Sequence, residues 1–151
     1  MFSAQDQIVI YNETFRYVYD KYGYKALKDL WAKMSKEWCY PLDKLTAQKG
    51  LEGAWEYWCK GEDGMLEREE ANYTVTLKDN VLTLDMHRCP SMGGEIIDRG
   101  YEIFPKYCEH CPSLYAPVLK KYGLIYKHYV EFDVQTMLPT SKCRVVIKPE
   151  Q

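Results

Sequence analysis

The chain has 151 residues, the length of one ordinary domain, and its formal net charge is −2. A chain of this size buries roughly 70% of its unfolded surface, so it needs neither a disulfide nor a metal to fold. The small net charge argues against a broad surface for nucleic acid or for a membrane. We therefore expect no nucleic-acid partner and no membrane partner.

Aromatic residues are abundant, with 14 Tyr and 4 Trp. Side chains of this kind suit the walls of a pocket and also a wet interface, so we expect a small-molecule ligand and leave a homodimer open. The first seven residues are polar and lack the basic start of a signal peptide, and no apolar stretch approaches the ~20 residues of a membrane span. These features predict a cytoplasmic protein, whose six cysteines are free thiols, metal ligands or catalytic groups rather than disulfides.

The N-terminal part shows apolar residues at the three-to-four-residue spacing of helices that bury one face. We expect helices over residues 4–22 and 24–38, and a third helix that starts at Asp43 or Thr46 and ends at Cys59. The expected boundary signals are the cap Ser3, the stops Gly23 and Pro41, and the turn 61–64.

After the helical part, the spacing of the apolar residues changes to every second residue. Residues 73–77 and 82–86 alternate between apolar and polar, which predicts a two-stranded hairpin with a polar turn at 78–80. Ser91-Met92-Gly93-Gly94 is expected to be a flexible break. A helical stretch over 95–122 should follow, divided by prolines.

Within that stretch, a helix is expected to start at Cys111-Pro112 and to end at Gly123. Strands over 124–134 and 143–147 close the chain. The sequence thus predicts one α+β domain, in which a helical half (1–62) precedes a ββαββ half (63–151) with an antiparallel sheet.

The most reactive side chains are concentrated in Cys108-Glu109-His110-Cys111-Pro112, which contains two thiols, an imidazole and a carboxylate. If a helix begins near Pro112, Cys111 lies at its N-terminal end, where the helix dipole favours a nucleophilic thiolate. Cys108 or Cys111 is then the candidate nucleophile. His110 or His87 is the candidate proton carrier, because an imidazole titrates near neutral pH.

Two other cysteines, Cys89 and Cys143, lie at the end and the beginning of predicted strands and could face the helix that carries Cys108. Four thiols meeting there would suit tetrahedral zinc, with His87 or His110 able to replace one of them. The cofactor is thus either absent or zinc, and the zinc ligands in this interpretation are Cys89, Cys108, Cys111 and Cys143. A redox dithiol at Cys108 and Cys111 is a further alternative.

Cys39 and Cys59 follow tryptophans near predicted helix ends and are interpreted as packing residues. His128 lies in an alternating strand and is interpreted as a surface or packed histidine rather than a ligand.

The C-terminal half resembles the L-2-amino-thiazoline-4-carboxylic acid hydrolase-like family. That family combines a Thr-Arg-Cys-like strand end, a Cys-x-x-Asp helix and a strand containing Cys-Asp-Phe-Arg. The matching segments here are His87-Arg88-Cys89, Cys108-Glu109-His110-Cys111 and Lys142-Cys143-Arg144-Val145. One departure is that Cys111 stands where the family has Asp, which puts the family's chemistry in doubt at that position.

The resemblance implies a hydrolase that acts on a C–N or C–S bond of a small molecule, such as a cyclic amidine or a thiazoline ring. The layout is also similar, more distantly, to vinyl-reductase-like and TRAPP-like small-ligand-binding domains. The alternative function is therefore a binding or sensing module with structural zinc or redox-sensitive thiols, and the second alternative is a thiol-disulfide oxidoreductase.

Overall fold

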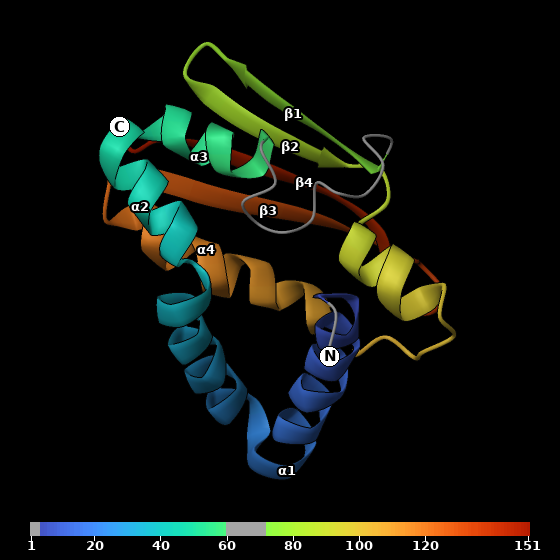
Figure 1. The fold of residues 1–151 in the computed structure, drawn as a ribbon. Helices are drawn as coiled ribbons and strands as arrows, with labels where there is room; N and C mark the ends of the chain where they lie inside the picture. Colours follow the sequence, from blue (N-terminus) through green and yellow to red (C-terminus); the bar gives the residue numbers. More distant parts are fainter. Residues whose placement is uncertain (1–3, 60–71) are drawn as a thin grey trace.

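A computed structural model describes residues 4–59 and 72–151 and shows a helical half followed by a four-stranded antiparallel sheet (Figure 1). The predicted α+β class is confirmed. The predicted cap Ser3, the turn 61–64 and the boundary between the two halves lie outside the described residues. Within the described residues, no helix is both long enough and apolar enough to cross a membrane.

The first helix, α1 (Ala4–Trp38), consists of two arms that meet at Gly23, as the sequence predicts. Gly23 has φ 86° and ψ 177°, a backbone conformation that glycine adopts without steric cost. The arms diverge from this point and form a V (Figure 1). The long apolar pattern therefore produces two helical faces rather than one continuous rod.

The next helices differ from the prediction in their boundaries. Pro41 lies in the first turn of α2 (Tyr40–Lys49), where its missing N–H has no intrahelical partner to lose, and so begins a helix rather than following one. The expected third helix is divided at Gly50, which has φ 60° and separates α2 from α3 (Leu51–Cys59).

The sheet has the order β1-β2-β4-β3 and every pairing is antiparallel. Its strands are β1 (Tyr73–Lys78), β2 (Val81–Met86), β3 (Leu124–Phe132) and β4 (Pro139–Pro149). The β1–β2 turn holds Asp79 and Asn80 at φ 51° and 60°, the left-handed pair typical of a two-residue hairpin. The last strand in the chain thus lies inside the sheet, between two strands that precede it.

The segment between β2 and α4 corrects two expectations. Ser91-Met92-Gly93-Gly94 is not a flexible break, because it lies within the π-helix η2 (Pro90–Ile97), and Met92 and Ile96 are fully buried. The stretch 95–122 is helical only at its two ends. After η2 the chain is irregular, and it then forms a short 3₁₀ turn, η3 (Tyr107–Glu109), that leads into α4 (His110–Lys120).

Two clusters of buried side chains form the core. One lies between the sheet and α2, α3 and α4, and includes Trp58, Leu84 and Leu119. The other joins α1 to η2 and includes Phe15 and Met92. Helix α4 runs between the sheet and the V of α1 (Figure 1). Its residues Leu114 and Leu119 belong to the first cluster, and the His110 ring at its N-terminal end contacts Phe15 of the second.

Candidate active site in a thiol-lined cavity

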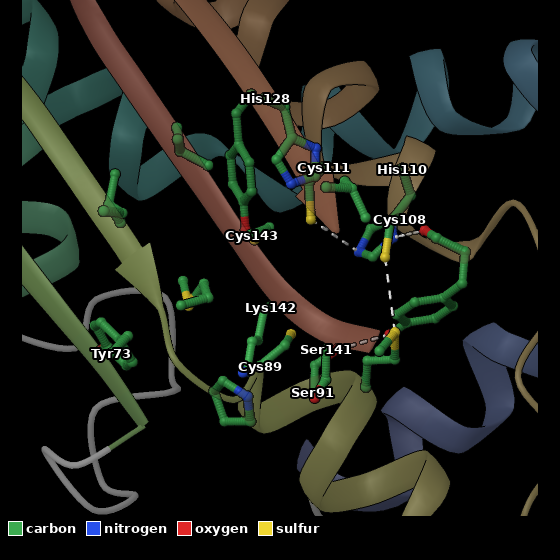
Figure 2. Close-up of a pocket in the computed structure, with 18 of the residues that line it drawn as sticks. Tyr73, Cys89, Ser91, Cys108, His110, Cys111, His128, Ser141, Lys142 and Cys143 are labelled. Atoms are coloured by element: carbon green, nitrogen blue, oxygen red, sulfur yellow. Dashed lines mark hydrogen bonds between the residues drawn. The ribbon is translucent and has the colours of Figure 1, made fainter. Parts of the chain in front are cut away.

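A cavity of about 80 Å³ lies where η2, the start of α4 and the sheet meet (Figure 2). Its walls are mainly apolar and aromatic, and they include Trp58, Tyr115 and Tyr126. The polar groups on the wall are four thiols, two imidazoles and a few hydroxyls, together with one lysine. An apolar pocket with a few convergent polar groups is the usual form of a small-molecule site.

The fold brings all four cysteines named from the sequence to this cavity. Cys108 and Cys111 are separated by one helical turn at the η3–α4 junction. Cys143 of β4 pairs with the last residue of β2, Met86, and Cys89 follows three residues later. The Cys89 N–H donates to the Ser141 carbonyl at 2.7 Å, which fixes the two strand ends side by side.

His110 and Cys111 pair a base with a thiol at this site. His110 Nδ1 bonds to the Tyr107 carbonyl, which can only accept, so Nδ1 carries the proton. His110 Nε2 is therefore the acceptor, and it lies 3.7 Å from Cys111 Sγ (Figure 2). This is the arrangement of a nucleophile, a base and a third group that orients the base.

Two other polar contacts line the same cavity. Cys108 Sγ lies 3.7 Å from the thioether sulfur of Met92, and the hydroxyls of Ser91 and Tyr107 lie 2.9 Å apart. Tyr107 thus contributes two groups to the site, because its carbonyl holds His110 and its hydroxyl pairs with Ser91.

Burial dominates the electrostatics of the site. It raises the pKa of Cys89 and Cys108, brings the pKa of Cys143 to about 12, and raises the pKa of Cys111 well above its ordinary value. We expected the helix N-terminus to lower the pKa of Cys111, but burial, followed by the neighbouring thiols, raises it.

The histidines shift in the opposite direction for the same reason. Desolvation lowers the pKa of His110 and of His128 to about 4. At neutral pH the cavity therefore holds neutral thiols and neutral imidazoles. Proton transfer between Cys111 and His110 must accompany a reaction rather than precede it.

The structure separates the two histidines named as proton carriers. His87 does not line the cavity; it is exposed, and its Nε2 lies 2.8 Å from the Thr74 hydroxyl on the hairpin. His128 lines the cavity instead, between Tyr126 and Val130 on the same face of β3. The alternating pattern of that strand could have indicated this position, because residues two apart in a strand share a face.

The packing role of Cys39 is confirmed. Its side chain is buried, and its thiol lies 3.5 Å from the Leu114 carbonyl of α4. Cys59 is partly buried at the end of α3 and does not line the cavity.

A second, more open pocket adjoins the cavity and shares Cys108, His128 and Val130 with it. It extends to the exposed side chains of Phe132 and Met137 near the ends of β3 and β4. The wall that carries Cys108 and His128 is thus common to the cavity and to this more open pocket.

Within residues 4–59 and 72–151, no set of three or more His, Cys, Asp or Glu side chains is placed to hold a metal ion. The four thiols share a cavity but do not form a preorganised tetrahedron. The zinc site and the redox dithiol stay predictions.

No protein-family model matches this chain, and no curated protein matches it with significance. The resemblance drawn from the three cysteine motifs therefore stays a prediction.

Proposed function

We propose that the protein is a cysteine-dependent hydrolase of a small molecule, with Cys111 as nucleophile and His110 as general base. The observation that carries this proposal is the pairing of Cys111 Sγ with His110 Nε2 at 3.7 Å in an apolar cavity. The Tyr107 carbonyl holds the ring in the tautomer that can accept the thiol proton.

The chemistry follows from the neutral state of both groups. As Cys111 sulfur bonds to an electrophilic carbon, its proton moves to His110 Nε2, which then gives that proton to the departing nitrogen or sulfur. A water molecule next loses a proton to the same imidazole and attacks the enzyme-bound carbon. The thiol takes the proton back when the carbon–sulfur bond breaks, so His110 ends each cycle neutral.

The cavity restricts the substrate to a small and largely apolar or flat molecule. Its volume is about 80 Å³, about half that of the engineered apolar cavity that binds benzene. Aromatic walls suit planar groups. The resemblance adds cyclic amidines and thiazolines as the first compounds to test, with cleavage at a C–N or C–S bond.

The test is a hydrolysis screen of cyclic amidines, thiazolines and small thioesters with chelator present, followed by mass spectrometry of acid-quenched protein. We expect a substrate-derived adduct on Cys111 and a loss of at least about 10³-fold in kcat for Cys111→Ala. His110→Gln should lose about 10²–10⁴-fold.

Cys59→Ser is the matched control, because this thiol lies outside the cavity. Full turnover by Cys111→Ala, or an adduct on another cysteine, excludes the proposed nucleophile.

A further inference from the structure

We propose that the cavity also binds a thiophilic monovalent cation, represented by Cu(I), through the sulfurs of Cys89, Cys108 and Met92. This site does not depend on the proposed hydrolase. It uses a different group of sulfur atoms from the Cys111–His110 pair, on the side of the cavity formed by η2 and η3 (Figure 2).

The first observation is the distance of 3.7 Å between Cys108 Sγ and Met92 Sδ. With a metal–sulfur bond of about 2.3 Å, two sulfurs at that distance subtend an angle of about 107° at one shared ion. The Met92 side chain is fully buried, so its thioether is held in place by the core and needs no ordering to bind. Two soft donors are thus already placed for one ion.

Cys89 provides the third sulfur. It precedes η2, so its side chain and Met92 belong to the start of the same helix. Cys89 lines the same cavity as Cys108 and Met92. Its backbone is fixed at the start of η2 by the hydrogen bond from its N–H to the Ser141 carbonyl, at 2.7 Å.

The chemical type of the donor atoms, two thiols and one thioether, indicates which metal ion the site would bind. Thiolate and thioether sulfurs suit Cu(I), whereas zinc takes Cys, His or carboxylate ligands and closes a tetrahedron. An angle of about 107° at the ion suits three or more ligands, so the Cys89 thiol is needed beside the sulfurs of Cys108 and Met92.

Binding is an acid–base exchange without oxidation. Each thiol that ligates the ion releases its proton to water, and the positive charge of the ion offsets the thiolates that would otherwise be unstable in a dry cavity. The copper stays monovalent throughout. Proton release on loading is therefore an independent signature of thiol ligation.

The experiment is an anaerobic titration of the reduced protein with Cu(I) against the chromophoric chelator bathocuproine disulfonate. We expect one Cu(I) per chain, accompanied by the ultraviolet absorption of a copper–thiolate bond. Met92→Leu keeps a side chain of similar size and removes the thioether, so it should weaken binding at least about tenfold. Cys108→Ser should weaken it at least about a hundredfold.

Cys59→Ser, outside the cavity, should bind Cu(I) as the parent protein does. Circular dichroism of each variant separates lost ligands from lost folding. The proposal is overturned if the chelator keeps all the copper, if Met92→Leu binds as tightly as the parent, or if Zn(II) binds as well as Cu(I) regardless of Met92. Because the hydrolysis screen uses chelated, metal-free protein, either proposal can fail without the other.

Discussion

The link between α1 and the site depends on one buried amide, that of Asn12. Its side chain is 0% exposed, and it holds the irregular segment that leads into η3. The Phe104 N–H donates to Asn12 Oδ1 at 2.9 Å, and Asn12 Nδ2 donates to the Glu102 carbonyl at 2.9 Å. Replacement of Asn12 by Ala removes both bonds.

The cost can be divided between the two partners. The Glu102 carbonyl keeps a second donor, the Arg16 guanidinium at 2.7 Å, so its loss is small. The Phe104 N–H belongs to a residue that is 3% exposed, and stranding a buried donor costs about 1–3 kcal/mol. Adding about 0.5–1.5 kcal/mol for the second bond, we expect Asn12→Ala to lower the free energy of unfolding by about 1.5–4.5 kcal/mol.

Urea unfolding at neutral pH measures this change directly. Arg16→Ala is the control, because it removes the other donor to Glu102 but leaves the Phe104 N–H bonded, and it should cost less than about 1 kcal/mol. If Asn12→Ala costs no more than Arg16→Ala, the buried amide does not anchor this segment and the reasoning fails.

Two further predictions concern packing and pH. A Cβ at Gly53 would lie 2.1 Å from the Leu45 carbonyl oxygen, so Gly53→Ala must separate α2 from α3 and should cost about 3 kcal/mol or more in thermal or urea unfolding. Gly94→Ala, which meets nothing within 4 Å, should change stability by less than about 1 kcal/mol, and an equal loss in both would contradict the steric argument. The Tyr122 hydroxyl, 2.6 Å from Asp43, lowers the pKa of that carboxyl in the folded state. Asp43 therefore stabilises the fold above the unfolded pKa of about 3.9, and this contribution is lost as pH falls through the folded value. The stability difference between the parent and Asp43→Asn should be constant near neutral pH and shrink below about pH 4; a difference that does not change with pH refutes the assignment.

Local signals predicted much of the fold. The alternation of Leu82 and Leu84 identified β2, and both side chains are buried in the sheet core. Gly23 ended the first helical arm because a positive φ is a property of the residue itself. The start of α4 near Pro112 followed from the same kind of local rule.

The prediction of a flexible break at residues 91–94 failed because burial of side chains outweighed the local conformational preference. The two glycines in Ser91-Met92-Gly93-Gly94 suggest a flexible break, but Met92 and Ile96 are buried against α1 and hold this segment in η2. Gly93 is also needed there, since a Cβ would lie 2.9 Å from the Arg88 side chain. Such a contact depends on residues brought together by folding and leaves no periodic trace.

The candidate site also combines features that the sequence predicts with features that only the tertiary structure sets. The sequence by itself determined that Cys108, His110 and Cys111 lie within one turn of chain, because their separation is set by covalent spacing. Only the tertiary structure brought Cys89 and Cys143 to the same cavity, through the antiparallel pairing of β2 with β4. It also raised the pKa of the Cys111 thiol, because desolvation depends on the groups that folding places around a side chain.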